Sequence, residues 1–418
     1  MPSEFVTVRR IVAGPGALGE LGGAAKELGR RALMVSGGGS LERAGVLARA
    51  RESLASAGVE FDEHPGVLTE PDLATVELLR GRLREGFDLA VSIGGGSVID
   101  AAKAAAGLAN ERAPAREYYD GRKIAARGIP HVAIPSTAGT GAEATPNAVI
   151  TDPERPGKTS IRGPWLLPDA AVVDPEILLG LPPRVTAESG LDALTQAIES
   201  YVSTHATPLT EGLSLHAVGL LAEGLVRSAE SPADIDGRTA CAYGSLMAGV
   251  ALANARLGVV HGLAHPLGAR LGLAHGLICG VLLAPSIRLN EPACPAKYAR
   301  VAKALADGFS AAGTRGITAA GIPRERVGYS RSAAARLHSV GQGEDRRPAE
   351  TERRSRAADL IEALMDLIEI PRKLPVAIAE KDVALIVAES MPSGSLKANP
   401  LRIEPAHVEK LLREVLPA

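Results

Sequence analysis

Residues 88–103 read DLAVSIGGGSVIDAAK, an apolar run that stops at three consecutive glycines and continues into a helical pattern. The apolar run predicts a buried strand, and the glycines allow close approach of the backbone to a ligand. The free N–H groups and the dipole at a helix N-terminus attract anions, so this turn suits a pyrophosphate. The pattern is not the GxGxxG fingerprint, and a glycine-rich turn alone often marks only a tight turn.

Predicted strands and helices alternate on both sides of this stretch. The sequence predicts strands at residues 5–12, 32–36, 59–61, 88–93 and 131–134, and helices at residues 17–28, 41–56 and 71–84. This order of elements indicates a parallel sheet with helices packed on its faces. Two more strands end in loops of similar chemistry, SGGGS at residues 36–40 and PSTAGTGAEAT at residues 135–145. Because ligands of such sheets bind at these turns, the loops reinforce one another as a phosphate site.

From about residue 182 the pattern changes to long helices rich in Ala and Leu, so a domain boundary is expected there. Further helices are predicted at residues 209–227, 235–255 and 275–289. Thr186 is expected to cap the helix that carries Asp192 and Gln196, which lie four residues apart and face the same way. A carboxylate on an apolar helix face needs a partner, and a structural salt bridge explains Asp192 as well as a ligand role does.

Three of the nine histidines lie in VHGLAHPLGARLGLAHGLICGVLL, residues 260–283. His261 and His265 are four apart and share a helix face, and His275 follows a break at Gly272. A buried imidazole needs a hydrogen bond or a metal, because an unpartnered polar group is costly to bury. One such histidine is ordinarily a core residue bonded to a carbonyl. Three together, with Asp192 upstream, favour a functional site.

Composition excludes several classes of protein. The chain has 418 residues, enough for two or three domains, and it is 46% hydrophobic and 22% charged with a net charge of −2. Neither nucleic acid nor a membrane is therefore expected as a partner. The first residues lack the apolar core of a signal peptide, so a cytoplasmic location is expected. Cys241, Cys279 and Cys294 form no CxxC pair and are expected to be small buried hydrophobes.

Several longer blocks carry a family resemblance. They are GGGSVIDAAK (94–103), PSTAGTGAEATPNAVI (135–150), LLPDAAVVDP (166–175), GLDALTQAIESYVS (190–203), the histidine segment, and SLKANPLRIEPAHVEKLL (395–412). Together they resemble the iron-containing, or group III, alcohol dehydrogenase family, whose superfamily includes maleylacetate reductase and glycerol dehydrogenase. The charged residues 307–356 depart from the pattern and are predicted to be an exposed insertion.

The resemblance implies a dehydroquinate synthase-like architecture. An α/β dinucleotide-binding domain, residues 1–181, would precede an all-helical metal and substrate domain, residues 182–418. The implied activity is that of an NAD(P)-dependent alcohol dehydrogenase or aldehyde reductase. Hydride would pass between nicotinamide C4 and a small alcohol or carbonyl substrate, with Fe(II) or Zn(II) polarising the substrate oxygen. The family also implies a homodimer or a larger homo-oligomer.

Site residues follow from the resemblance position by position. Those implied for the cofactor are Gly37, Gly38, Gly95, Gly96, Ser97, Asp100, Thr137, Thr140, Thr145 and Lys158. Those implied for the metal are Asp192, Gln196, His261 and His275. His265 matches the second histidine of the family's HxxxH, near nicotinamide and substrate, and would relay a proton. Arg270 would either recognise an anionic substrate group or form a salt bridge.

Two departures from the family pattern matter for the cofactors. Gly37 stands where many members carry an Asp for the adenosine ribose, so a 2′-phosphate is not repelled and NADP(H) is tolerated beside NAD(H). Gln196 stands where the fourth metal ligand is ordinarily His, and a neutral amide oxygen binds transition metals more weakly than imidazole. Either a weakened metal stays on three protein ligands, with Gln196 or water completing the shell, or the chain works without metal.

Three alternatives remain open at this point. One is a metal-independent reductase of the maleylacetate reductase type. Another is a dehydroquinate synthase-like lyase, whose phosphate-sugar substrate calls for a more basic site than this sequence offers. The third is a non-catalytic relative, against which the joint presence of Asp192 and the three histidines argues.

Overall fold

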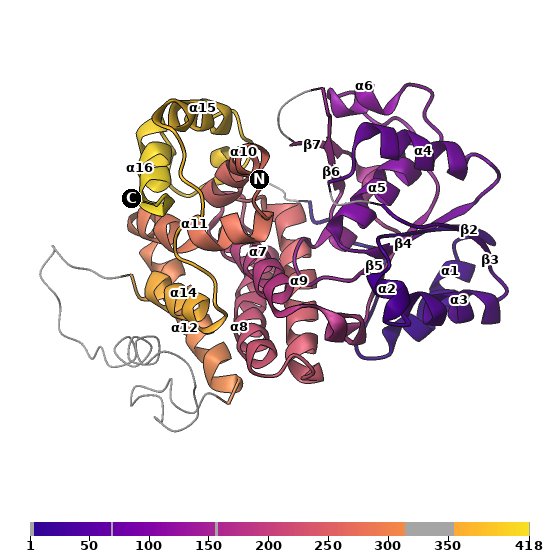
Figure 1. Ribbon diagram of the computed structural model, residues 1–418, viewed down its shortest axis with the longest axis horizontal. Helices are drawn as coiled ribbons and strands as arrows, with labels where there is room; N and C mark the ends of the chain where they lie inside the picture. Colours follow the sequence, from indigo (N-terminus) through magenta and orange to yellow (C-terminus); the bar gives the residue numbers. More distant parts are fainter. Residues whose placement is uncertain (1–3, 68–69, 155–157, 314–354, 418) are drawn as a thin grey trace, which may run out of the picture. The chain divides into compact units, whose positions relative to one another are not determined.

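The computed structural model describes residues 4–67, 70–154, 158–313 and 355–417. The chain divides into two compact units, Met1–Leu181 and Pro182–Ala418, and each is described by itself (Figure 1). The division falls where the sequence pattern changes to long helices. Most of the charged segment expected to be an insertion lies outside the described residues, at 314–354.

A parallel sheet forms the centre of the first unit. Among the described residues it has six strands in the order β1-β8-β5-β4-β2-β3, and every neighbouring pair is parallel. The strands are β1 (Arg10–Ala13), β2 (Arg31–Ser36), β3 (Glu60–His64), β4 (Leu89–Gly94), β5 (His131–Pro135) and β8 (Ala170–Val173). A separate antiparallel pair joins β6 (Asn147–Thr151) to β7 (Lys158–Arg162). The predicted α/β class of this unit is confirmed.

Helices cover both faces of this sheet. The helices of this unit are α1 (Leu21–Lys26), α2 (Ser40–Arg43), α3 (Val46–Ser56), α4 (Leu73–Leu83), α5 (Gly96–Gly107) and α6 (Ala115–Tyr119). Figure 1 shows α4 and α5 on one side of the strands and α1 and α3 on the other. Successive residues of β4 alternate accordingly, since Val91 packs in one apolar cluster with Leu54 and Ala90 in another with Leu79. A strand apolar on both faces is what a doubly covered sheet requires.

Among the predicted elements of this unit whose bounds differ from the structure, two are informative. The strand predicted at residues 5–12 pairs only over Arg10–Ala13, so that prediction was too long at its start. The helix predicted at residues 41–56 is broken at Gly45, whose φ of 73° is left-handed and ends α2 before α3 begins. Helical spacing of apolar residues continues through the break, which is why periodicity alone did not reveal it.

The regular secondary structure among the described residues of the second unit is entirely helical. Its helices are α7 (Pro183–Val202), α8 (Pro208–Glu230), α9 (Ile235–Ala255), α10 (Val259–Leu271), α11 (His275–Asn290), α12 (Pro295–Ala311), α14 (Arg356–Leu367), α15 (Glu380–Ser390) and α16 (Pro405–Val415). The predicted capping role of Thr186 is wrong. Pro183 is the first residue of α7, and Thr186 lies one turn inside, where its hydroxyl donates to the Pro182 carbonyl at 3.2 Å. The fixed φ of proline favours it at that first position.

Glycines set the spacing between α7 and α11. A Cβ on Gly276 would lie 2.1 Å from the carbonyl oxygen of Glu188, and one on Gly280 would lie 2.6 Å from Leu191 Cδ1. The two glycines are one helical turn apart, so at these two positions α11 has no side chain to hold the helices apart. This close approach brings the neighbouring residues of α11 beside the polar residues of α7.

One helix is long and apolar enough to cross a membrane when only its length and composition are considered. This is α8; the bent pair of α9 and α10 also passes that test if it is counted as one span. Helices from the core of a folded unit pass the same test, and 50% of the apolar window on α8 is buried. This finding covers the described residues only.

Candidate metal centre and nucleotide-binding loops

Four donor side chains converge in the helical unit. Asp192 comes from α7, His261 from α10, and His275 and Cys279 from α11, and one ligand atom of each lies within 4.8 Å of the others. Asp192 Oδ1 is 3.3 Å from His261 Nε2 and 3.6 Å from His275 Nε2. Cys279 Sγ is 3.6 Å from His275 Nε2 and 3.9 Å from His261 Nε2. Carboxylate, imidazole and thiol groups at these separations can bind one divalent transition metal together.

A second carboxylate holds the ring of His261. Nδ1 of His261 lies 2.7 Å from Glu199 Oε2, and Glu199 also accepts hydrogen bonds from the backbone N–H groups of Val260 and His261. With Nδ1 paired in this way, Nε2 is the nitrogen that faces Asp192. A carboxylate behind a histidine fixes its tautomer and orientation, as is usual for histidines that bind metals.

Charge and burial act against each other in this cluster. Burial opposes ionisation of Asp192, but the neighbouring His275 and His261 outweigh it and lower the pKa of the carboxyl. Burial also acts to lower the pKa of His261, yet Cys279 and Asp192 overcome it and raise that pKa well above its usual value. The Asp192 carboxylate and the imidazoles therefore stabilise one another's charged forms, as is common at functional sites.

Gln196 follows Asp192 by one turn of α7 and is 4% exposed. Its Oε1 has no hydrogen-bond partner among the described residues. A buried carbonyl oxygen without a partner is costly, and a bound cation would remove that cost. His275, in contrast, keeps 31% of its side chain exposed, so the cluster is accessible on that side. The residues present therefore fit a divalent metal with room for one further ligand.

His265 lies beside this cluster. It is on α10 one turn beyond His261, and its ring stacks on that of His275 with centroids 5.2 Å apart and 28° between the planes. The helix ends at Gly272, whose φ of 63° is left-handed, which is the break expected between His265 and His275. Of the two roles considered for Arg270, the ion pair is present, and its partner is Glu389.

In the first unit the glycine-rich loops meet at the carboxyl ends of adjacent strands. A Cβ on Gly96 would lie 2.6 Å from Thr140 Oγ1, and one on Gly95 would lie 3.6 Å from Thr137 Oγ1. Gly37, which follows β2, approaches Val98 of α5 so closely that a Cβ would lie 3.3 Å from its Cγ2. The loops after β2, β4 and β5 therefore lie together at the N-terminus of α5, where an anion is favoured.

A buried ion pair ties α5 to the loop after β5. Lys103 Nζ lies 3.1 Å from Asp100 Oδ1, donates to the carbonyls of Ala142 and Thr145, and reaches the Thr145 hydroxyl at 3.2 Å. Asp100 also accepts a hydrogen bond from the N–H of Val149. Burial lowers the pKa of Lys103 and raises that of Asp100. The polar atoms of Asp100 and Thr145 thus point into the protein and hold the loop in place.

The other residues implied for the cofactor lie around the same loops. Ser97 is in the first turn of α5, and its hydroxyl accepts a hydrogen bond from the N–H of Glu70 at 3.2 Å. A Cβ on Gly38 would meet nothing within 4 Å, so that position is open. Lys158 is the first residue of β7 and pairs with Thr151 through the backbone.

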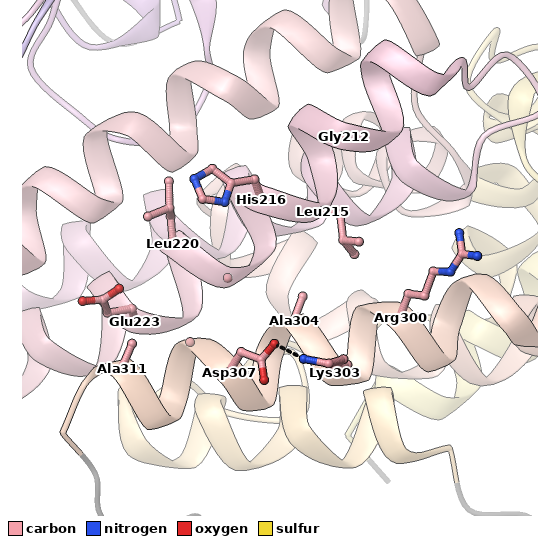
Figure 2. Close-up of a pocket in the computed structure, with 12 residues that line it drawn as sticks. Gly212, Leu215, His216, Leu220, Glu223, Arg300, Lys303, Ala304, Asp307 and Ala311 are labelled. Carbon is pink, nitrogen blue, oxygen red and sulfur yellow. Dashed lines mark hydrogen bonds and ion pairs between the residues drawn. The ribbon is translucent and has the colours of Figure 1, made fainter.

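A groove in the second unit contains none of these residues. It encloses about 560 Å³ between α8 and α12, and Figure 2 shows His216 and Glu223 on one wall and Arg300 on the other. Lys303 and Asp307 form an ion pair on the same wall as Arg300. His216 is exposed at this groove.

Comparison with known proteins decides the family. The profile of iron-containing alcohol dehydrogenase matches residues 8–175, and that of the Fe-containing alcohol dehydrogenase family, C-terminal, matches residues 186–322. The chain belongs to the iron-containing alcohol dehydrogenase family. The family resemblance and the two-part fold inferred from the sequence are therefore confirmed, and the chain is a member of an oxidoreductase family.

Individual relatives match most of the length of this chain. It is 36% identical over 318 residues to an NADPH-dependent butanol dehydrogenase of Clostridium saccharobutylicum, covering 72% of this chain and 78% of the relative. It is 34% identical over 306 residues to an NAD-dependent methanol dehydrogenase of Bacillus methanolicus, covering 72% and 80%. A solved structure of 1,3-propanediol oxidoreductase covers 100% of both chains with a TM-score of 0.84 and 28% identity.

Two residues that lie in or beside the donor cluster were not predicted from the sequence. Cys279 follows His275 by four residues and Glu199 follows Asp192 by seven, so each shares a helix face with a residue that had been singled out. That spacing was the available signal. Cys279 is buried as expected, but its Sγ lies beside two imidazoles.

Proposed function

We propose that this chain is an NAD(P)-dependent alcohol dehydrogenase or aldehyde reductase that uses a divalent metal, Fe(II) or Zn(II), and acts on small alcohols and aldehydes. The observation that supports it best is the convergence of Asp192, His261, His275 and Cys279 within 4.8 Å, in a chain of this family. A non-catalytic relative would have no need to keep a buried carboxylate among imidazoles, because burying such groups is costly. A cytoplasmic homo-oligomer remains part of the proposal, as the resemblance implies.

In this proposal the chain's own residues bind and orient the reactants. A bound metal would supply Lewis-acid polarisation of the substrate oxygen, and a bound nicotinamide would exchange hydride at C4. Asp192, His261 and His275 would hold the metal, and Glu199 would keep His261 Nε2 directed at it. His265, stacked on the partly exposed His275, would take a proton from the substrate hydroxyl at a ring nitrogen and pass it to water.

The cofactor would bind at the glycine-rich loops of the first unit. The N–H groups of Gly95, Gly96 and Ser97 at the start of α5 would receive the pyrophosphate. Thr137 and Thr140 adjoin these glycines and would line the nucleotide. Asp100 and Thr145 would act by positioning, because their polar atoms hold the loop after β5.

The adenosine end of the cofactor would lie near the loop after β2. Gly37 and Gly38 place no carboxylate there, so a 2′-phosphate is accepted and both NADP(H) and NAD(H) serve. Relatives dependent on each cofactor are consistent with this expectation. Lys158 would extend to the ribose.

The proposal is tested by metal analysis and by activity on the same preparation. Protein purified without chelator is assayed for Fe and Zn, and oxidation of NADPH and NADH is followed with a panel of small aldehydes before and after EDTA. About one metal per chain, with activity lost on chelation and restored by metal, supports the proposal. Turnover by metal-free protein would instead indicate a reductase of the maleylacetate reductase type. Absence of redox activity with every carbonyl would overturn the dehydrogenase assignment.

A further inference from the structure

We propose that Cys279 is the fourth protein ligand of the metal. Gln196, which stands at the position implied for that ligand, offers only a neutral side chain that binds the metal poorly. The inference rests on the proposed metal-dependent function and defines the donor set of that same site as Asp192, His261, His275 and Cys279. It differs from a set of one carboxylate and three imidazoles, because a thiolate from α11 takes the place of an imidazole from α7.

Four of the donor separations are close to those around a single tetrahedral ion, and all the ligand atoms lie within 4.8 Å of one another. Bonds of about 2.0–2.2 Å to nitrogen and oxygen and about 2.3 Å to sulfur place N and O donors about 3.4 Å apart and N and S donors about 3.6 Å apart. The observed N to O separations are 3.3 and 3.6 Å, and the N to S separations are 3.6 and 3.9 Å. The side chains therefore need only small movements to bind one ion through all four atoms.

The position of Cys279 on α11 accounts for this arrangement. Cys279 follows His275 by one turn, and the glycines that adjoin these two residues, Gly276 and Gly280, let α11 approach α7 closely. The side chain of Cys279 is 0% exposed, so its sulfur faces the donors and not solvent. The other two cysteines differ. Cys241 packs against Gly224 of α8, and Cys294 Sγ donates to the Asn290 carbonyl.

Charge balance favours the same assignment. A divalent ion bound by one carboxylate and two neutral imidazoles leaves a net positive charge on the ion and its direct ligands, and the Glu199 carboxylate faces that charge only through the ring of His261. The Cys279 thiol would release its proton to solvent on binding, and the thiolate would neutralise the ion and its direct ligands. Gln196 offers only a neutral oxygen. Thiolate is also a soft ligand, so the site should prefer Zn(II) and Co(II) to Mn(II) or Mg(II).

The experiment uses Co(II) as the probe in the full-length protein. The parent, Cys279→Ser, Cys294→Ser and Gln196→Ala proteins are stripped of metal and titrated with Co(II), and near-ultraviolet absorption is recorded for the thiolate-to-cobalt charge-transfer band. Zn(II) affinity is measured on the same proteins by competition with a chromophoric chelator. We expect the band in every protein except Cys279→Ser. We also expect the Zn(II) affinity of Cys279→Ser to be lower than that of the parent by more than about 100-fold. This loss is larger than the ~10–100-fold loss of affinity that follows removal of an outer hydrogen-bond partner.

Each outcome has a separate meaning. Co(II) binding without the band in the parent, or equal Zn(II) affinity in Cys279→Ser, overturns the inference and leaves the proposed metal-dependent function intact. Absence of Co(II) and Zn(II) binding in the parent overturns both. Misfolding of Cys279→Ser is detected by its urea unfolding curve without metal. In that case X-ray absorption of the Zn(II)-loaded parent tests the inference. A sulfur ligand at about 2.3 Å supports it, and a shell of only nitrogen and oxygen ligands at about 2.0–2.2 Å refutes it.

Discussion

Replacing Gly276 with Ala should destabilise the second unit and weaken its metal site together. The added Cβ would lie 2.1 Å from the carbonyl oxygen of Glu188, whereas real Cβ contacts essentially never fall under 3.0 Å. The backbones of α7 and α11 must then separate by about 1 Å, because a carbonyl oxygen cannot rotate away as a side chain can. Overpacking costs about 1–3 kcal/mol, and the better helix propensity of Ala returns about 0.5–1 kcal/mol. Because the obstacle is backbone, the cost falls at the upper end of the overpacking range, and we expect a net loss of about 2 kcal/mol in the free energy of unfolding.

Urea unfolding of the metal-free proteins measures this loss without any contribution from a bound ion. Metal–ligand distances tolerate deviations of about 0.2 Å, so the same displacement of α11 should also lower Zn(II) affinity. Gly212→Ala is the matched control. Gly212 lies on α8, where a Cβ would meet nothing within 4 Å, and that change should stabilise by about 0.4–1 kcal/mol. A Gly276→Ala protein within about 0.5 kcal/mol of the parent would refute the close-approach argument.

Three further predictions concern other parts of the chain. Glu199→Gln should lower Zn(II) affinity by about 10–100-fold in chelator competition, since the carboxylate behind His261 is lost; unchanged affinity would show that this hydrogen bond does not tune the site. Gly96→Ala should weaken NAD(P)H binding by about tenfold or more, because the added Cβ would lie 2.6 Å from Thr140 Oγ1. Nicotinamide fluorescence measures this binding. Gly23→Ala is the control, since its Cβ would meet nothing within 4 Å. Burial raises the pKa of Glu143 from 4.5 to about 7, so the folded state keeps a proton that the unfolded chain loses. Stability should therefore fall, by up to about 3 kcal/mol, as the pH rises between about 4.5 and 7. Glu143→Gln should abolish that part of the pH dependence in urea unfolding, and an identical profile in both proteins would contradict it.

The sequence predicted most of the fold because its strongest signals are local. An apolar run that ends in Gly94 to Gly96 specifies both β4 and the start of α5, and the long apolar helices of the second unit are equally plain. What it missed depends on contacts between distant residues. Gly45 breaks a helix inside a continuous periodic pattern, and only pairing with β8 shows that β1 starts at Arg10.

The candidate site shows the same division between local and distant information. The resemblance places Asp192 and the histidines by position, and a match by position leads to Gln196 as the fourth metal residue. Cys279 could not be found in that way, because its relation to Asp192 is made by the packing of α11 on α7. Both Gln196 and Cys279 lie one turn beyond a donor, on helices that contribute to one cluster. A donor lost from one helix can thus be replaced from the other without a change in the backbone. The glycines that set the separation of these helices then matter as much to the metal site as the ligands do.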